Sequence, residues 1–404
     1  MKMKKALSVL LGGVMAFSFA ACGEEEQPAG KTNDEKAIEL VDFTVEVEEG
    51  RDPVVLQLTD PQIIDAAQER YPDRLGGTLD EIWATDTVEE NCYQYIRETV
   101  QNTDPDLIIM TGDIIYGQFD DAGTALIDFV QFMESFNIPW APIMGNHDAE
   151  TTKGVDWQCE QYTNAKNCLF DQKDLTGNGN YSVGIVQGGK LKRVFYMLDS
   201  NSYAAASNET MMNGHSQKSA GFGSDQIAWY TQQILDIKEL SKDTKYSFAY
   251  HIPQEVFKDA FASYFSSSRS VNIDLHPEKV WGDFGYMGYN VGGWDDDYEV
   301  WFNMQQLGVD SVFVGHEHCN SGSVVYGGIR VQYGQKSSAY DQINWFNRQT
   351  GEVVGSTGKP SGGDYIPMIG GTVIPLSKKD GSIKNPYIDL CGFENGILDW
   401  SQWV

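Results

Sequence analysis

Five short apolar runs, each followed at once by aspartate, asparagine or histidine, constrain the fold of this chain more than any other feature of its sequence. The sharpest lies in Asp106–Gly117, where the apolar residues 107–110 lead through Thr-Gly to Asp113. A continuous apolar run of this length indicates a strand that is buried on both faces. Ligands in open α/β sheets bind at the carboxyl ends of the strands, and a glycine before the carboxylate lets the backbone approach an ion closely. We therefore expect Asp113 to hold a cation at the end of a buried strand.

The four other runs end in side chains of the same kind. They are 54–58 before Asp60, 138–144 before Gly145-Asn146-His147-Asp148, 246–250 before His251, and 311–314 before Gly315-His316-Glu317-His318. Carboxylate, amide and neutral imidazole ligands suit zinc, iron and manganese. Two such ions about 3.5–4 Å apart can clamp a phosphate oxygen and generate hydroxide at neutral pH. The sequence therefore predicts a two-metal site built from several strand ends.

Taken in order, these blocks resemble the calcineurin-like metallophosphoesterase superfamily, which includes purple acid phosphatases and bacterial phosphodiesterases. The resemblance covers roughly residues 54 to 333, and its most specific parts are the Gly-Asn-His-Asp and Gly-His-Glu-His blocks. It implies an α/β fold, namely a four-layer α/β/β/α sandwich of two mixed sheets. It also implies a hydrolase for phosphomonoesters or phosphodiesters that uses two divalent or mixed-valence transition metals (iron, zinc or manganese).

The resemblance implies a role for each residue of the blocks. One metal would be held by Asp113, Asn146, His251 and His316, and the other by Asp60, Asp113 and His318, with Asp113 as the bridge. His147 would contact the substrate phosphate and help to protonate the leaving oxygen. Asp148 would orient the imidazole of His147 and favour its protonated form.

Two departures from the family's pattern concern the second metal. The first block usually reads Asp-x-His, whereas Gln62 stands at the histidine position and offers only an amide oxygen. Tyr116, three residues after Asp113, matches the tyrosine that ligates ferric iron in purple acid phosphatases, whose first block also lacks the histidine. The alternative is that Tyr116 packs beside the site without binding a metal.

Three hypotheses about function follow from these features. The first is an active phosphoesterase. The second is a catalytically degenerate phosphoesterase-fold lipoprotein that acts as a binding or sensing module, and the missing histidine supports it. The third is a solute-binding lipoprotein, which leaves the five metal-type blocks without a reason.

The N-terminus has the pattern of a bacterial export signal. Lysines are concentrated in Met1–Lys5, residues 6–21 are small and apolar, and Phe19-Ala20-Ala21-Cys22 resembles a lipobox, whose cysteine becomes lipidated. The apolar segment is short for a membrane-spanning helix, which needs ~20 residues. We predict a signal peptide at 1–21, lipidation of Cys22, and a location in the cell envelope on the outer side of the cytoplasmic membrane. An ordinary cleaved signal with an incidental cysteine is the alternative.

The charge of the chain bears on its partners. There are 29 basic and 58 acidic residues, which gives a formal charge of −29. Such a chain should repel polymeric nucleic acid and anionic membrane surfaces. We therefore expect a small phosphorylated substrate, no nucleic acid polymer, and membrane attachment through the lipid anchor only.

Composition and periodicity divide the exported chain further. We predict a flexible tether at 22–37, a catalytic domain at 38–345 and a small β-rich extension at 346–404. Apolar spacing predicts helices at 87–100 and 122–136. A third predicted helix, 224–240, would be capped by Ser224 and would turn Trp229 inward.

Candidate residues outside the five blocks lie in loops. Cys159 and Cys168 flank a polar loop and are the best candidates for a disulfide in an exported chain. His215 lies in a loop that follows a strand end, where it could contact substrate. The stretch Trp281–Trp301 is rich in glycine and aromatic residues, so Tyr286 and Tyr289 are candidates for a pocket wall; simple packing of the loop is the alternative.

Overall fold

The computed structural model of the chain describes residues 30–65, 67–68, 86–201, 221–262, 298–356 and 358–392. Internal contacts divide the chain between Thr32 and Asn33, and residues 33–404 form one unit. The predictions for Cys22, His215, Tyr286 and Tyr289 lie outside the described residues. Among the residues described, no helix combines the length and the apolar character that a membrane span requires.

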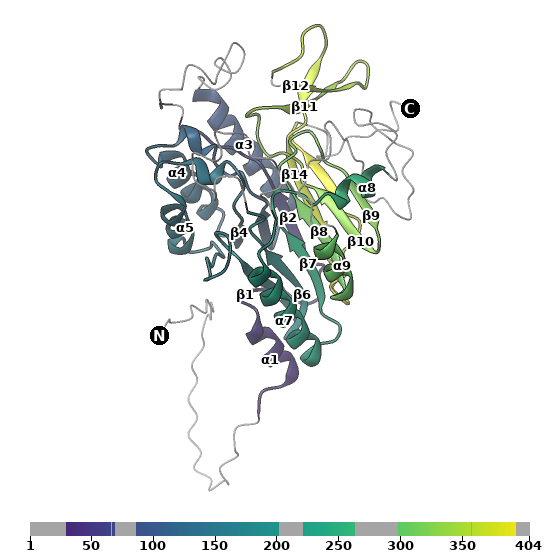
Figure 1. Cartoon of the computed structure of the whole chain (residues 1–404). Coiled ribbons are helices and arrows are strands. Elements are labelled where there is room, and N and C mark those ends of the chain that lie inside the picture. Colours follow the sequence, from purple (N-terminus) through teal and green to yellow (C-terminus); the bar gives the residue numbers. More distant parts are fainter. Residues whose placement is uncertain are drawn as a thin grey trace, which may run out of the picture. The chain divides into compact units, whose positions relative to one another are not determined.

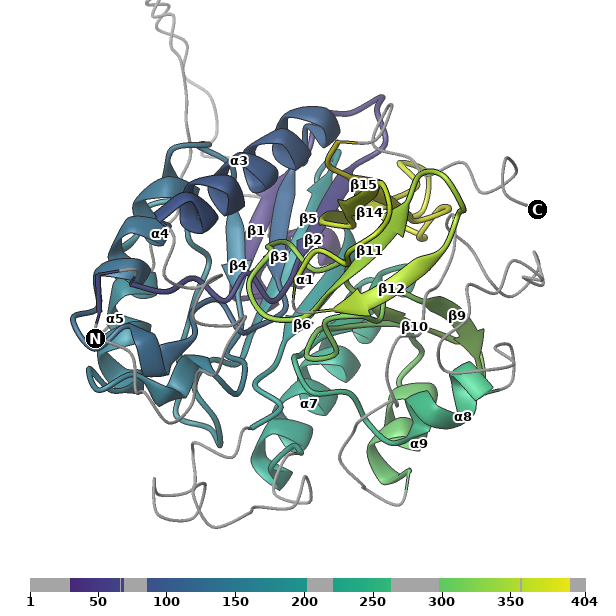
Figure 2. The same cartoon turned by 90° about the horizontal axis from the view of Figure 1, so that it is seen from above.

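Two mixed β-sheets form the centre of this unit (Figures 1 and 2). One has seven strands in the order β1-β5-β6-β7-β8-β10-β9: β1 (Phe43–Glu46), β5 (Tyr181–Gln187), β6 (Lys190–Met197), β7 (Lys245–Ala249), β8 (Val309–Val314), β10 (Ile329–Tyr333) and β9 (Ser323–Tyr326). The other has five, in the order β15-β14-β2-β3-β4: β15 (Tyr387–Leu390), β14 (Gly370–Pro375), β2 (Val54–Leu58), β3 (Leu107–Met110) and β4 (Trp140–Pro142). Strands β6, β7, β8 and β10 are parallel, as are β2, β3 and β4. The carboxyl ends of each parallel set therefore meet at one edge of its sheet.

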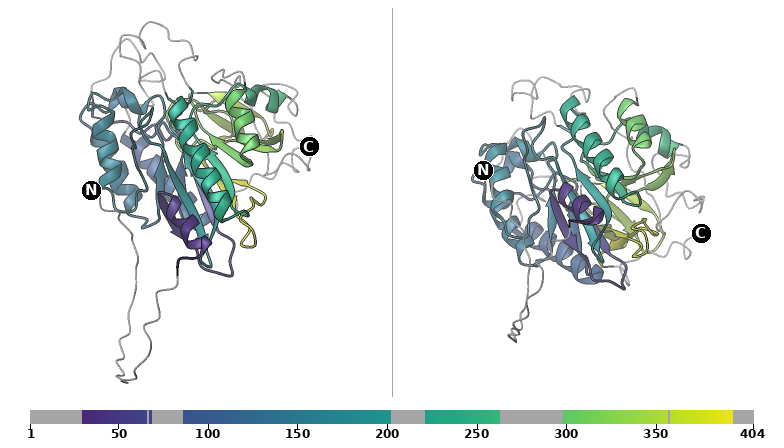
Figure 3. Two further views of the ribbon diagram at one scale, coloured as in Figure 1. Left: turned by 60° about the horizontal axis from the view of Figure 1, so that its bottom comes forward. Right: turned by 90° about the horizontal axis from the view of Figure 1, so that it is seen from below.

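Helices cover the outer face of each sheet. α3 (Asp86–Thr103) packs on the five-stranded sheet, and α4 (Thr124–Glu134) and α5 (Val155–Asn164) lie on the same side (Figure 2). The other sheet is covered by α1 (Asn33–Leu40), α7 (Ser224–Leu240), α8 (Val256–Ala262) and α9 (Glu299–Gln306). Figure 3 shows the purple α1 beside the teal α7 on this face. The predicted α/β/β/α sandwich is therefore confirmed.

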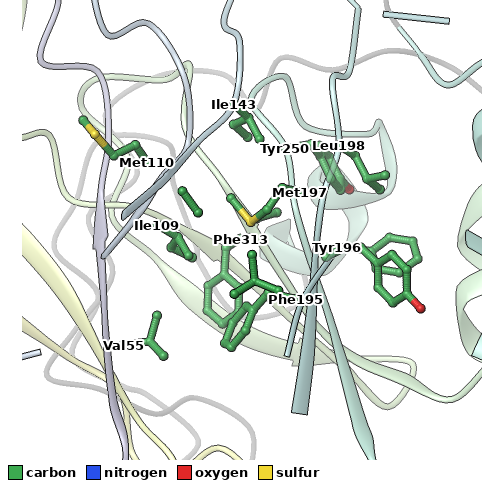
Figure 4. Close-up of a cluster of buried hydrophobic side chains, with 14 of the residues drawn as sticks. Val55, Ile109, Met110, Ile143, Phe195, Tyr196, Met197, Leu198, Tyr250 and Phe313 are labelled. Atoms are coloured by element: carbon green, nitrogen blue, oxygen red, sulfur yellow. The ribbon is translucent and has the colours of Figure 1, made fainter. Parts of the chain in front are cut away.

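The main hydrophobic core lies between the two sheets. Val55 and Ile109 come from the five-stranded sheet, and Phe195 and Phe313 from the seven-stranded sheet, and all four are fully buried (Figure 4). The rings of Phe195 and Phe313 have centroids 6.3 Å apart. Each such side chain stabilises the fold by about 1.5–3 kcal/mol through removal from water. The two sheets are thereby held together, so the carboxyl ends of their strands have fixed positions.

The predicted helices are present, with differences in detail. α7 begins at Ser224, but its N-cap is Gly223, whose N–H donates to the Gln226 side chain at 2.7 Å. Trp229 is only half-buried, and the next residue, Tyr230, takes the buried position. The buried face of α7 is therefore shifted by about one residue relative to the prediction.

The predicted disulfide is not formed. Cys159 and Cys168 are separate buried thiols. Cys159 lies on α5, within a stretch where no helix was predicted, and Cys168 pairs through its backbone with Trp140 on β4. The two cysteines belong to different parts of the packing, so their closeness in sequence does not bring their side chains together.

The predicted boundaries of the catalytic domain also differ from the structure. α1 begins at Asn33, inside the predicted tether 22–37, and packs on α7. Beyond the predicted boundary at 345, β14 pairs antiparallel with β2 in the centre of the five-stranded sheet. A small antiparallel sheet of β12 (Val353–Ser356), β11 (Ile343–Asn347) and β13 (Tyr365–Pro367) spans that boundary. Within the predicted extension, β14 and β15 therefore belong to the five-stranded sheet, whereas β12 and β13 belong to the small one.

Candidate metal centre

The five predicted blocks meet where the parallel strands of both sheets end. Asp60, Asp113 and the Gly145–Asp148 block follow β2, β3 and β4, whereas His251 and His316 follow β7 and β8. Several of these residues turn the chain sharply, because Asp60, Asp113 and His316 have φ angles of 51°, 50° and 75°. Such left-handed conformations are strained for residues other than glycine, and they concentrate at functional sites. These strained backbone conformations lower the stability of the fold, but they direct the side chains towards one another.

A first group of four ligand-type side chains consists of Asn146 and, around it, Asp113, His251 and His316. The Oδ1 of Asn146 lies 3.1 Å from His251 Nε2 and 2.9 Å from His316 Nδ1. Asp113 Oδ2 lies 3.3 Å from the same His251 Nε2. His251 donates from Nδ1 to the carbonyl of Thr111 at 2.7 Å, so its Nε2 is the atom that faces the group. Such an outer-shell hydrogen bond is how proteins orient a metal-binding imidazole.

The charges of this group are strongly coupled. Burial lowers the pKa of His251, but the Asp113 carboxylate outweighs that effect and raises it to about 10. Burial and the nearby His251 cation lower the pKa of His316 to about 3. Burial opposes ionisation of Asp113, yet the His251 and His147 cations hold its pKa well below the usual range. In this group the positive charge of His251 stabilises the buried Asp113 carboxylate, as a bound metal ion would.

A second group contains Asp60, Asp113 and His318, whose ligand atoms all lie within 4.8 Å of one another. Asp60 Oδ2 accepts hydrogen bonds from Thr59 Oγ1 at 2.6 Å and from the His316 backbone N–H at 3.1 Å. Asp60 Oδ1 has no hydrogen-bond partner among the described residues, although it is buried and lies 3.5 Å from His318 Nε2. A buried carboxylate oxygen without a hydrogen bond is costly. A cation between Asp60, Asp113 and His318 would compensate this cost, so these residues fit a metal.

Asp341 contacts the ring nitrogen of His318 that faces away from Asp60. This residue was not predicted from the sequence. Its Oδ2 lies 3.2 Å from His318 Nδ1, which leaves Nε2 directed at Asp60. Burial opposes ionisation of Asp341, but the contact with His318 lowers its pKa to about 2. A carboxylate behind a metal-binding histidine is a recurrent arrangement. The only sequence signal was that Asp341 lies in the segment after the strand-like run 329–333.

Three glycines make room for the ligands. A Cβ on Gly112 would lie 2.6 Å from His251 Nδ1. A Cβ on Gly145 would lie 2.9 Å from Asp113 Cγ, and one on Gly315 would lie 2.7 Å from Asp60 Oδ2. The glycines of the three blocks are therefore required by close approach to the ligands.

His147 lies beside the first group, but its partner differs from the prediction. Its backbone N–H donates to Asp113 Oδ1 at 2.8 Å, and its ring Nδ1 lies 2.7 Å from Glu150 Oε2. Burial lowers the pKa of His147, but Asp113 and Glu150 raise it to about 9. Asp148 instead accepts from the backbone N–H groups of three residues, namely Ile114, Ile115 and Gly145. Glu150, and not Asp148, therefore orients the imidazole, because Asp148 is used to fix the loops that carry Asp113 and Asn146.

Tyr116 and Gln62 occupy the places where the sequence departs from the family's pattern. The ring of Tyr116 stacks on His147, with centroids 4.0 Å apart, and metal binding by its hydroxyl stays a prediction. The Oε1 of Gln62 accepts a hydrogen bond of 2.9 Å from the Nζ of Lys336. The amide oxygen that was a candidate ligand is therefore bound to a lysine.

Comparisons with known proteins bear on the family. The model of the family described as calcineurin-like phosphoesterase matches residues 54–320. A protein named probable inactive purple acid phosphatase 14, from Arabidopsis thaliana, is 25% identical over 289 residues, which are 64% of this chain and 65% of that protein. The phosphatase DCR2 of Saccharomyces cerevisiae is 26% identical over 239 residues, 56% of this chain and 38% of that protein.

Among solved structures, a dimetal phosphatase from Danio rerio is 11% identical, with a TM-score of 0.42 over 80% of this chain and 95% of that one. The chain spans less than two thirds of the length of either relative named above. The family match itself covers more than half of the chain and includes all five blocks from Asp60 to His318. This chain belongs to the calcineurin-like phosphoesterase family.

Proposed function

We propose that the protein is a dinuclear-metal phosphoesterase that hydrolyses phosphomonoesters or phosphodiesters outside the cytoplasmic membrane. The observation that carries this proposal is the buried Asp60 Oδ1, which lacks a hydrogen bond within the described residues and faces His318 and Asp113. The first group of ligand-type side chains would hold one metal and the second group the other, with Asp113 shared. When bound, two such ions lower the pKa of water and stabilise negative charge on phosphate oxygens.

We assign protonation of the leaving oxygen to His147. Its Nδ1 is engaged by Glu150, so the proton at Nε2 is the one available for transfer. A pKa of about 9 keeps this imidazole protonated at neutral pH, as a general acid requires. Its side chain is 21% exposed, which gives a substrate oxygen access to it. The Asp113 contact to the His147 backbone keeps the acid at a fixed place relative to the metal ligands.

Substrate size and location form part of the same proposal. The formal charge of −29 favours a small phosphorylated substrate over a nucleic acid polymer. The signal pattern at 1–21 and the lipobox cysteine Cys22 support attachment to the outer side of the cytoplasmic membrane.

A catalytically degenerate protein that binds or senses phosphorylated compounds is the second candidate. Gln62 replaces a histidine ligand, and its oxygen is taken by Lys336. Purple acid phosphatase relatives in Arabidopsis thaliana carry the words probable inactive in their names. This candidate predicts metal binding without turnover.

The test measures metal content and turnover on the same sample. The protein is treated with a chelator, reloaded with iron, zinc or manganese, counted for metal by native mass spectrometry, and assayed with p-nitrophenyl phosphate and bis(p-nitrophenyl) phosphate. Asp113→Asn should lose both metal and turnover, whereas Asp380→Asn, an exposed aspartate with the same change, should lose neither. Two metals with turnover support the proposal. Two metals without turnover favour the degenerate protein, and no bound metal refutes both.

A further inference from the structure

Lys336 is a buried amine beside the second group of ligands. It follows β10, is 1% exposed, and donates from Nζ to the carbonyl of Asp60 at 2.7 Å and to Gln62 Oε1 at 2.9 Å. Burial lowers its pKa, and the carboxylates of Asp60, Asp341 and Asp113 oppose this effect. A buried amine is stable only where such partners surround it.

The backbone fixes this lysine in place. Lys336 forms a parallel bridge with Thr59, immediately before Asp60. The N–H of Ser337 donates to the Thr59 carbonyl at 3.0 Å, and the N–H of Gly370 donates to the Lys336 carbonyl at 3.1 Å. The position of the amine is therefore set by the strands around it and not only by its own flexible side chain.

This arrangement removes a ligand from the second group. Gln62 Oε1 is committed to Lys336, and Gln62 Nε2, which cannot bind a cation, has no hydrogen-bond partner in the part of the chain that the structure describes. The second group is left with Asp60, Asp113 and His318, whereas the first has four ligand-type side chains.

We propose that Lys336 weakens the second metal site relative to the first, so that the two metals bind in order and the second remains exchangeable. This inference rests on the proposed function, because it requires a metal at each group. It assigns to Lys336 a positioning role, since Lys336 acts through Gln62 and touches no reacting atom.

Metal titration of the chelator-treated full chain tests the inference without reference to activity. With Zn²⁺ or Mn²⁺ alone, calorimetry should resolve a tighter and a weaker step. His251→Ala should remove the tighter step, and His318→Ala the weaker one. Lys336→Met should strengthen the weaker step by at least about tenfold while the tighter step changes little, because it frees Gln62 Oε1 to bind the metal. Lys190→Met, at an exposed hairpin position, makes the same change of charge and should alter neither step.

A second variant keeps the inference testable if Lys336→Met does not fold. Gln62→Met removes the amide oxygen but leaves the lysine, so the weaker step should keep its affinity. A tenfold loss in this variant would identify Gln62 as a ligand and overturn the inference. Equal affinities of the two steps in the unaltered protein, or no effect of Lys336→Met beyond that of Lys190→Met, would also overturn it while leaving the proposed function intact. A protein that binds no metal would refute both.

Discussion

Substitution of Gly145 by alanine tests whether the metal ligands are held by close packing of their loops. A Cβ at this position would lie 2.9 Å from Asp113 Cγ and would overlap Asp113 Oδ1. Two carbon atoms prefer about 3.5–4.0 Å, so relief of this contact alone moves Asp113 or its strand end by about 0.6–1.1 Å, and the closer overlaps with Asp113 Oδ1 and its backbone N require at least as much. The φ of Gly145 is not in the left-handed region, so the effect is steric and does not arise from backbone strain.

The displaced residue decides how large the effect is. Asp113 belongs to both groups of ligands and also accepts the His147 N–H, so its movement disturbs both proposed metals and the proposed acid. We expect kcat/KM to fall about 100-fold, the usual cost of a misplacement of about 1 Å in an active site. The free energy of unfolding should fall by about 1–3 kcal/mol, as for an overpacked core.

The measurement compares Gly145→Ala with Gly30→Ala, a position where an added Cβ meets nothing within 4 Å. Metal affinity is measured by calorimetry, kcat/KM with p-nitrophenyl phosphate at saturating metal, and unfolding by urea after chelation. Metal affinity and kcat/KM that match those of Gly30→Ala would refute the reasoning, since they would mean that Asp113 accommodates the methyl group without leaving its place.

Three further variants probe the residues around the ligands. Asp341→Asn should weaken the step lost in His318→Ala by about 10–100-fold, because the imidazole loses the carboxylate that orients it; an unchanged titration would exclude this role. Glu150→Gln should move the alkaline fall of kcat/KM to lower pH. Asp113 and Glu150 together raise the pKa of His147 to about 9, and the acid works only below its pKa, so loss of the Glu150 charge should lower the upper limit of the active pH range. An unmoved profile would assign the fall to another group. Tyr116→Ala should lower kcat about tenfold by releasing the stacked His147 ring, whereas Tyr116→Phe should keep it. A visible absorption band of iron-loaded protein that disappears in Tyr116→Phe would instead identify a tyrosinate ligand.

Local sequence patterns were sufficient to find the ligand-type side chains that meet at the strand ends. Asp60 and Asp113 each follow an apolar run at once, and such a run reports a buried strand without knowledge of its neighbours. Lys336 and Asp341 also follow a strand, β10, but nothing local indicates that β10 lies next to β8 and that its loop reaches Thr59. Their positions depend on long-range pairing, and the same is true of β14, which joins β2 across more than three hundred residues.

The error concerning Asp148 has a geometric cause. Residues 148–150 form a short 3-10 helix with His147 as its N-cap, and side chains three residues apart lie on the same side of such a turn. The Glu150 carboxylate therefore lies beside the imidazole of His147, whereas the Asp148 carboxylate accepts hydrogen bonds from the backbone at Ile114 and Gly145. The family's pattern gives the identity of the neighbouring acid, but only the local helix determines which carboxylate reaches the ring.

The protonation of His251 links metal binding to pH through the same contacts. Its Nδ1 is held by the Thr111 carbonyl, so a proton and a metal ion would compete for Nε2. The Asp113 carboxylate raises the pKa of His251 to about 10 because it stabilises that proton, and it would stabilise a metal ion for the same electrostatic reason. Metal binding at the first group would therefore release a proton from His251, so the apparent affinity of that group should rise with pH over the neutral range. Burial and the His251 cation lower the pKa of His316 to about 3, so His316 would contribute no proton to this dependence.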